Sequence, residues 1–474
     1  MGAEPDPYDA LPYTEHAYAE AHPERLAVVA RLARWSPPPL ARAAVLELGC
    51  GRGGHLLPMA SAMPGARFVG VDRSRRQLED ARAIALAVAL ANATFVEASF
   101  ASPVEGGPFD YVVAHGVCSW VAPADRRALL QAIAAALAPG GVAYVSFNVL
   151  PGWYARMAAR DWMRGTPPRD AAASLAWLRA QVSPELADYR RRLDAVAARL
   201  AETDRAYVAH EYLSAEHHPQ RVEDLLAEAA DAGLAYLGDA IPQETALELL
   251  PDAARARAAG LDAAGAQRVV DFVVDSAFRR ALFVRADEAA ARGWRWSPEL
   301  DVTALGALRV ASRLVSSEGG GALETFEGAG VTVQIAHAGL RAALHELARI
   351  APRSLPVAEL AGRVDAGPDF VTELFDLWLA TRVLDLHAHE PPLGDAASAR
   401  PVACPVARWH ARNGGPVTNR WHQEVLLEDP RLRAVLEVLD GAHTVESAAA
   451  AAGCTEKVTR AAVASLAAAA LLVG

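Results

Sequence analysis

Short apolar runs alternate with segments of helical spacing between residues 43 and 147. Apolar runs of this kind, bounded by polar residues or glycine, are typical of buried β-strands, and apolar positions three and four apart indicate amphipathic helices. The predicted strands cover residues 44–48, 67–71, 94–97, 111–115 and 141–147, and the predicted helices cover residues 74–90 and 123–137. This alternation predicts βαβ units in a largely parallel sheet, a doubly wound, Rossmann-like α/β fold whose ligands bind at the carboxyl ends of the strands.

The pattern changes on both sides of this core. The N-terminal part contains a predicted helix over residues 23–35, which the prolines of "SPPPL" end. Beyond Trp153 helical spacing dominates as far as Arg292, and short strands such as "GVTVQIA" then mix with helices. We therefore expect four parts: an N-terminal helical cap (1–40), the α/β core (41–155), a helical regulatory or substrate domain (156–292) and an α+β C-terminal domain, for which a winged helix is one option (293–474).

Composition and charge limit the classes of partner. With 474 residues the chain exceeds the roughly 250–300 residues at which single cores stop growing. Its formal net charge is −11 and it has no basic stretch, which argues against nucleic-acid binding.

The four cysteines lie far apart, so neither disulfides nor a zinc site is indicated, and a reducing cytoplasm suits them. His387 and His389 have no further placed ligands, and no long apolar run is present, so we predict neither a metal site nor membrane insertion.

The segment "VLELGCGRGGHLLPMA" (45–60) combines a buried strand, a glycine-rich turn and the start of a helix. Such a turn places free backbone N–H groups beside a ligand, and glycine lets the main chain approach it closely. Gly49, Gly51 and Gly54 fit the G-x-G-x-x-G pattern of dinucleotide-binding loops. Glu47, Gly49, Gly51 and Gly53 equally fit the acidic-x-G-x-G-x-G loop of enzymes that use S-adenosylmethionine (SAM).

Glu47 distinguishes these two cofactors. A dinucleotide would bring a pyrophosphate to this loop, and a carboxylate there would repel it. SAM instead presents a cationic amino group near a cationic sulfonium, which a carboxylate attracts. We therefore predict that the loop binds SAM, the alternative being that Glu47 merely ends its strand.

Three further residues are candidates for binding the nucleoside of SAM. Asp72 ends the second predicted strand in "FVGVDRS", where a carboxylate can accept hydrogen bonds from ribose hydroxyls. Its alternative role is to cap the helix that follows. Ser99 and Phe100, in "FVEASF" after the third strand, lie where adenine would bind, although a simple strand-to-loop transition explains them equally well.

The segments "VLELGCGRGGHLLPMA", "FVGVDRS", "FDYVVAHGVCSWV" and "APGGVAYVSFNVLPGW" together resemble class I SAM-dependent methyltransferases that carry a methyltransferase regulatory domain. The best-known members of this group are bacterial protein-lysine methyltransferases that act on outer-membrane proteins of rickettsiae. The similarity continues through "HEYLSAEHHPQRVEDLLAEAADAGLAYL" to "ARPVACPVARWHARNGGPVTN", so it covers most of the chain. The resemblance implies a class I methyltransferase core, SAM as cofactor and S-adenosylhomocysteine (SAH) as product.

The sequence departs from the family beside the expected acceptor pocket. Cys118 stands where the family usually has a tyrosine, and Val149 and Leu150 replace an aromatic or threonine-rich step. If those aromatic residues shape the acceptor pocket, the acceptor of this chain need not be a protein lysine.

Three residues are candidates for the catalytic end of the site. His115 ends the fourth predicted strand, beside the expected methyl group, and is interpreted as the group that receives the acceptor's proton or orients the acceptor. Trp120 and Tyr13 are interpreted as aromatic walls that could hold an ammonium group by cation–π contact. The alternative for His115 is a structural histidine bonded to a neighbouring loop.

Three hypotheses about function follow. The first is a SAM-dependent methyltransferase acting on a protein or peptide, at a lysine amine. The second keeps the chemistry but transfers the methyl group to a small natural product or a ribosomally made peptide. The third is a non-catalytic protein that binds SAM or docks a partner, against which the intact Glu47, glycines and Asp72 argue.

Overall fold

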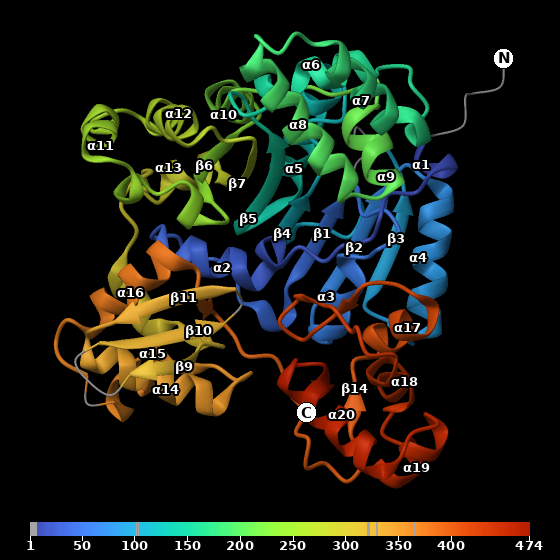
Figure 1. Ribbon diagram of the computed structural model, residues 1–474. Helices are drawn as coiled ribbons and strands as arrows, with labels where there is room; N and C mark the ends of the chain where they lie inside the picture. The colour runs from blue at the N-terminus through green and yellow to red at the C-terminus, as the bar shows by residue number, and fades with distance from the viewer. Residues whose placement is uncertain (1–6, 101, 103, 320–322, 329, 365) are drawn as a thin grey trace.

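A seven-stranded sheet forms the centre of the molecule (Figure 1). The computed structural model describes residues 7–474 apart from 101, 103, 320–322, 329 and 365. The strands are β1 (Ala44–Leu48), β2 (Arg67–Asp72), β3 (Ala93–Glu97), β4 (Phe109–Ala114), β5 (Leu137–Asn148), β6 (Leu234–Asp239) and β7 (Phe278–Arg285). Their order is β3-β2-β1-β4-β5-β7-β6. β1 to β5 are parallel and β7 is antiparallel to both of its neighbours, so the predicted doubly wound fold is confirmed.

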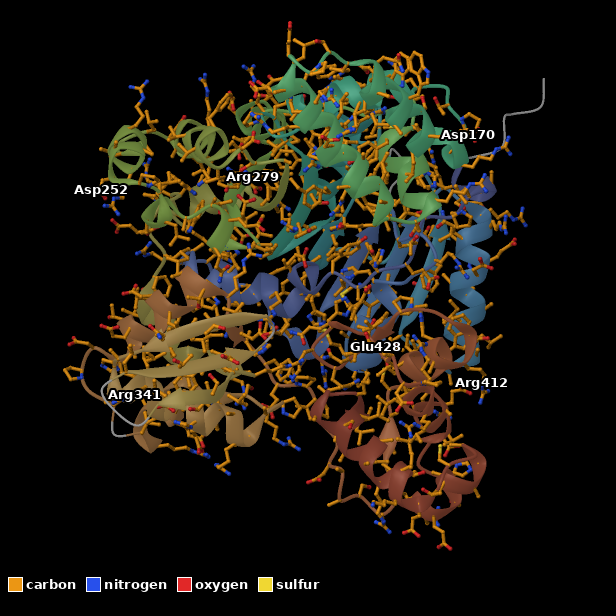
Figure 2. The ribbon with its side chains drawn as sticks, viewed as in Figure 1. Asp170, Asp252, Arg279, Arg341, Arg412 and Glu428 are labelled. Carbon is orange, nitrogen blue, oxygen red and sulfur yellow. The ribbon has the colours of Figure 1, made fainter. Side chains whose placement is uncertain are left out.

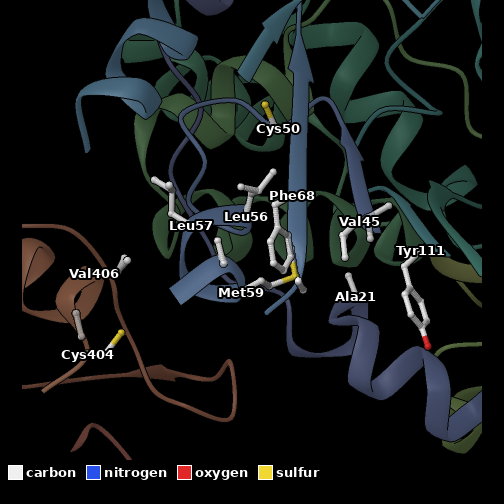
Figure 3. Packing of buried hydrophobic residues seen from close by; sticks show 14 of the residues in the cluster. Ala21, Val45, Cys50, Leu56, Leu57, Met59, Phe68, Tyr111, Cys404 and Val406 are labelled. Carbon is white, nitrogen blue, oxygen red and sulfur yellow. The ribbon is translucent and has the colours of Figure 1, made fainter. Parts of the chain in front are cut away.

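Helices cover both faces of this sheet. On one face lie α2 (Pro23–Leu32), α3 (Leu56–Ala62) and α4 (Arg75–Ala87), and on the other lie α5 (Pro123–Ala136) and α10 (Val222–Asp231). Side chains alternate between the faces as a strand requires: Val45 and Phe68 pack on the first face, and Leu46 and Val69 on the second. Figure 3 shows Phe68 beside residues of α3. This packing fixes α3, the helix that follows the glycine loop.

A helical unit is inserted between β5 and β6. It comprises α6 (Tyr154–Met163), α7 (Ala171–Gln181), α8 (Ala187–Ala201), α9 (Arg205–Tyr207) and a π-helical turn (Val208–Tyr212). Leu175, Leu193 and Tyr212 belong to its own small core. α11 (Asp252–Ala258), α12 (Ala263–Val274) and α13 (Ala286–Ala291) complete this part of the chain. The inserted helices lie above the sheet in Figure 1, over the carboxyl ends of the parallel strands.

The sequence pattern did not predict β6 and β7, which lie in the part of the chain dominated by helices. The apolar run of β7 is interrupted by Arg279, a charged residue that a strand of this kind rarely buries. In the structure Arg279 is 2% exposed, and ion pairs of 2.8 Å join it to Asp239 of β6 and Asp271 of α12. Arg279 is labelled in Figure 2, and its charge is neutralised by Asp271, eight positions earlier in the chain, and by Asp239, 40 positions earlier.

The C-terminal region forms two lobes, below the sheet in Figure 1. The first contains β8 (Arg309–Ser312), β9 (Val315–Gly319), β10 (Glu324–Gly328), β11 (Val331–Ile335), β12 (Leu355–Pro356), β13 (Leu384–His387), α14 (Ala338–Ile350), α15 (Val357–Arg363) and α16 (Phe370–Thr381). The second contains β14 (Val402–Ala403), β15 (Val417–Thr418), β16 (Glu424–Val425), β17 (Leu472–Val473), α17 (Pro405–Asn413), α18 (Pro430–Val438), α19 (Val445–Ala451) and α20 (Glu456–Ala468). The predicted α+β character of this region is confirmed.

Each lobe packs on a different part of the core. Val28 and Leu32 of α2 contribute to the hydrophobic cluster of the first lobe. The second lobe reaches α3, where Cys404 Sγ lies 3.4 Å from Ser61 Oγ, and Figure 3 shows Cys404 on this side of the core. Among the described residues no helix combines the length and apolar character needed to cross a bilayer.

Candidate active site

A cavity of about 1340 Å³ lies at the carboxyl ends of the parallel strands, beneath the inserted helices. The structure brings together nearly all of the residues that the sequence pattern selected. Those that line the cavity are Tyr13, Glu47, Gly49, Gly51, Asp72, Ser99, Phe100, His115 and Trp120. Gly53 is buried next to the cavity, where a side chain would collide with Leu57 and Phe95, so it permits the loop to pack on α3.

Glu47 is a buried carboxylate with an unused acceptor. It lies in β1, paired with Gly70 and Val113 of the neighbouring strands, and is 4% exposed. None of the described residues forms a hydrogen bond with its Oε2 atom. Burial raises the pKa of Glu47 well above its ordinary value, and the nearby Asp72 adds to this effect. An unpaired carboxylate of this kind is costly unless a cationic ligand binds to it.

The glycine loop turns tightly around the end of β2. Gly49, Gly51 and Gly53 have φ of +78°, +51° and +80°. In this region of φ the backbone of residues other than glycine is strained. The Gly49 N–H donates to Val71 O at 2.8 Å, so the loop is tied to the neighbouring strand. A Cβ atom on Gly49 would lie 2.5 Å from Val117 Cγ2.

We expect Gly49→Ala to destabilise the protein more than Gly260→Ala does. Both glycines have nearly the same φ, +78° and +77°, but nothing lies within 4 Å of the position of a Cβ on Gly260. Each substitution should cost about 1–2 kcal/mol for the left-handed backbone. Contact with Val117 should add about 1–3 kcal/mol for Gly49→Ala. Chemical denaturation measures both values, and equal losses would show that Val117 moves aside freely.

Asp72 anchors the glycine loop to the start of α4. Its Oδ2 accepts a hydrogen bond of 2.9 Å from the Gly51 N–H, and its Oδ1 accepts one of 2.8 Å from the Ser74 N–H. The cap of α4 is Ser74, whose Oγ accepts from the Gln77 N–H at 3.2 Å. Asp72 therefore does not cap the helix, and burial raises the pKa of its carboxyl group. Ser99 and Phe100 lie beyond β3, at the same side of the cavity as Asp72.

His115 directly follows β4, next to Gly116. Its Nδ1 is 2.9 Å from the Tyr144 hydroxyl, and the Tyr18 ring stacks on the imidazole with centroids 3.5 Å apart. Burial lowers the pKa of His115 well below its ordinary value, with contributions from His55 and Arg280. The imidazole is therefore neutral at physiological pH and held in one orientation.

The N-terminal segment (residues 8–18) covers the cavity and was only partly predicted as a site element. Tyr8 stacks on His210 with centroids 4.4 Å apart, and the Tyr18 N–H donates to His55 Nδ1 at 3.2 Å. Tyr13 lies between these points, with its ring 5.7 Å from that of His210. Trp120 also lines the cavity, and its ring is 4.7 Å from that of His217.

The π-helical turn contributes residues that the sequence pattern did not select. His210, Glu211 and Tyr212 of this turn line the cavity, and so does Tyr207 at the end of α9. Turns of this type occur frequently at functional sites. The available signal was the cluster of aromatic and charged residues in "YVAHEY", which stands out in an alanine-rich helical stretch.

Three family models match the chain in sequence order. Residues 45–141 match a methyltransferase domain, residues 204–285 a predicted methyltransferase regulatory domain, and residues 399–462 the C-terminal winged-helix domain of PKMT. The second model includes β6 and β7, so in this chain the regulatory segment completes the central sheet.

Curated relatives cover parts of the chain. An uncharacterized protein of Rickettsia prowazekii is 31% identical over 60% of this chain and 54% of its own length. A trans-aconitate 2-methyltransferase of Paracidovorax citrulli is 32% identical over 32% of this chain and 56% of its own length. The chain thus spans little more than half the length of these relatives.

A solved structure matches the whole architecture. The structure of PKMT2 from Rickettsia typhi in complex with AdoHcy superimposes with a TM-score of 0.85 at 22% identity, covering 98% of this chain and all of that one. At this identity the match establishes the fold. In its strand order and its three domain matches, the chain is similar to class I methyltransferases that carry a regulatory domain and a PKMT-type winged helix.

Proposed function

We propose that the protein transfers a methyl group from SAM to a lysine side-chain amine of a protein or peptide. The observation that carries this proposal is the unpaired Oε2 atom of Glu47, buried beside the glycine loop in a cavity large enough for a cofactor and an acceptor. The PKMT winged-helix match and the PKMT2 fold support a protein acceptor. The reaction would take place in the cytoplasm.

The residues around the glycine loop could bind each part of SAM. Glu47 would bind the cationic amino group, and the backbone of Gly49 and Gly51 would approach the ligand closely. The Asp72 carboxylate keeps lone pairs for the ribose hydroxyls after accepting its two backbone hydrogen bonds. Ser99 and Phe100 would contact adenine.

At the acceptor end the protein has to align an amine and deliver it without its proton. SAM supplies a methyl carbon on a positively charged sulfur, and the carbon–sulfur bond breaks as the new carbon–nitrogen bond forms. His115, fixed by Tyr18 and Tyr144, would orient the acceptor. Trp120 and Tyr13 would form its walls and hold an ammonium group by cation–π contact.

A small anionic acceptor is the alternative to lysine. The trans-aconitate 2-methyltransferase matches about a third of the chain, and its named substrate is a carboxylate. Glutamates and arginines both line the present cavity, and ion pairs join Glu15 to Arg52 and Glu20 to Arg280. The Glu47 Oε2 atom has no partner among the described residues, which favours a cationic ligand beside it, and the PKMT winged-helix match favours a protein acceptor.

Labelled SAM tests the acceptor directly. The purified protein would be incubated with tritium-labelled SAM and an extract of its source organism, and mass spectrometry would locate the methyl groups. We expect label on lysine side chains of proteins. Label confined to small molecules would contradict the lysine proposal. Binding of SAH without any methyl transfer would indicate a docking protein. Absence of SAH binding would exclude both enzymatic hypotheses.

We expect His115→Ala to lower kcat by about 10- to 100-fold, because a misplaced acceptor reacts more slowly. SAH binding, measured by calorimetry, should change little, because His115 acts on the acceptor. His443→Ala is a matched control, since His443 lies in the second C-terminal lobe and bonds to Asp440 at 2.9 Å. If His115→Ala turned over as fast as wild type, His115 would have only a structural role.

A further inference from the structure

We propose that Glu211 is the group that binds the lysine ammonium and takes its proton before methyl transfer. This inference rests on the proposed function and adds a catalytic residue to it. It begins from the position of Glu211 in the π-helical turn, where the inserted helices meet the cavity. In this turn the neighbours of Glu211, His210 and Tyr212, are also buried, so the turn is fixed by packing.

Tyrosine side chains line the cavity near the Glu211 carboxylate. Tyr13, Tyr18 and Tyr212 each lie within electrostatic reach of it. The Tyr13 and Tyr207 rings have centroids 6.5 Å apart, and the Tyr207 and Tyr212 rings 6.4 Å apart. Aromatic faces attract an ammonium group, and a carboxylate among them pairs with it directly. Together these residues form a receptor for the end of a lysine side chain.

Tyr18 links this receptor to the cofactor end of the cavity. Burial raises the pKa of the Tyr18 hydroxyl, and both Glu211 and Glu47 add to the rise, so the ring lies within electrostatic reach of both carboxylates. The same ring stacks on His115. Glu47, Glu211 and the stacked Tyr18 and His115 rings all line this one cavity.

The charges around Glu211 set its affinity for protons. Burial raises the pKa of Glu211 to about 7, although Arg156 and Arg160 of α6, Arg199 of α8 and the Tyr13 hydroxyl act in the opposite direction. A base works best when its pKa lies near the working pH. His115 is less suited to this step, because burial lowers its pKa well below the ordinary value.

The reaction balances with these groups alone. The Glu211 carboxylate takes one proton from the lysine ammonium and becomes a carboxylic acid, leaving a neutral amine. The amine lone pair forms a bond to the methyl carbon, and the carbon–sulfur bond electrons return to sulfur, giving neutral SAH and a methylammonium group. Glu211 then releases its proton to water, so each turnover yields one proton.

Glu211→Gln tests this role, with a copolymer of glutamate and lysine as methyl acceptor and a copolymer of glutamate and tyrosine as the lysine-free blank. We expect kcat to fall about 100-fold, the usual contribution of a general base. The wild-type rate should rise with pH through about 7, as Glu211 ionises. The variant rate should instead rise toward the amine's own pKa of about 10.4.

Binding measurements separate this inference from the proposed function. Calorimetry should show equal SAH affinity for Glu211→Gln and wild type, whereas n-butylamine should bind to the SAH complex about tenfold more weakly in the variant. Glu216→Gln is the matched control, because Glu216 is exposed and pairs with His218 outside the cavity. It should behave as wild type does in every measurement.

Tyr13→Phe provides a second variant that keeps the carboxylate. The Tyr13 hydroxyl lowers the pKa of Glu211, so its loss should raise this pKa and move the rising limb of the rate to higher pH. Wild-type turnover with an unchanged pH profile in Glu211→Gln would overturn the role of Glu211 while leaving the methyltransferase proposal intact. A wild-type protein that does not bind SAH would overturn both.

Discussion

Replacing Glu47 by glutamine is expected to weaken SAH binding about 100-fold, or roughly 3 kcal/mol. The side chain is 4% exposed, and its Oε2 atom has no hydrogen-bond partner among the described residues, so the ligand's ammonium group would be its counterion. Glutamine keeps the shape but offers a neutral oxygen, and it leaves the ammonium without its ion pair in a buried place. Isothermal titration calorimetry with SAH measures the loss.

Glu97→Gln is the control for this substitution. Glu97 ends β3 as an exposed residue, at the same edge of the sheet but outside the cavity, so its replacement should leave SAH affinity unchanged. Equal affinity of wild type and Glu47→Gln would exclude Glu47 from the cofactor site.

The pH dependence of binding gives a second measurement on Glu47. Burial raises the pKa of Glu47 well above its ordinary value in the unliganded protein, and a bound ammonium would lower it again. Wild-type affinity for SAH should therefore be full above the unliganded pKa and fall as the pH drops through it. Glu47→Gln should lack this dependence, because it has no proton to gain at this position.

The sequence was most informative where one segment determines its own structure. The strands β1, β2, β4 and β5 are apolar on both faces because helices cover both, so they stand out as short hydrophobic runs. The glycine loop could be recognised from a few adjacent residues, since Gly49, Gly51 and Gly53 all need positive φ. The predicted helix over residues 23–35 likewise corresponds to α2.

Elements that depend on distant partners could not be predicted in this way. Arg279 makes β7 appear too polar for a central strand until Asp239 and Asp271 are placed beside it. Tyr18 has no local motif, and its stacking on His115 joins residues 97 positions apart in the numbering. Glu211 became a candidate through burial and the cavity around it, which no sequence spacing reports.

The second C-terminal lobe also contributes to the site through contacts that are distant in sequence. His422 Nε2 lies 2.7 Å from Nδ1 of His55, which lines the cavity at the start of α3. Glu424 of the same lobe accepts a hydrogen bond of 2.9 Å from the Ala17 N–H, next to Tyr18. The lobe therefore holds both the glycine-loop helix and the N-terminal segment, which gives a physical reason for its presence in the same chain.

Arg279→Met is expected to destabilise the protein by about 3–5 kcal/mol, the usual cost of leaving buried charges without their partner. Methionine has a similar length, so the loss reports the charge more than the volume. The substitution leaves Asp239, also bonded to the Tyr236 hydroxyl, and Asp271 buried without a cation. Chemical denaturation measures the free energy of unfolding. Arg285→Met is the control, because Arg285 ends the same strand and pairs with the exposed Asp287, for which a loss below about 1 kcal/mol is expected.

The pH dependence of this loss identifies its cause. Burial already raises the pKa of Asp271 to about 6 beside the cation, and without Arg279 the pKa of Asp271 in the folded protein should rise further. The unfolded chain has an aspartate pKa of about 3.9, so folding of the variant takes up protons and becomes less favourable as pH rises. The difference between Arg279→Met and wild type should therefore be larger at about pH 8 than at about pH 5. A difference independent of pH would show that lost packing, and not the unpaired carboxylates, destabilises the variant.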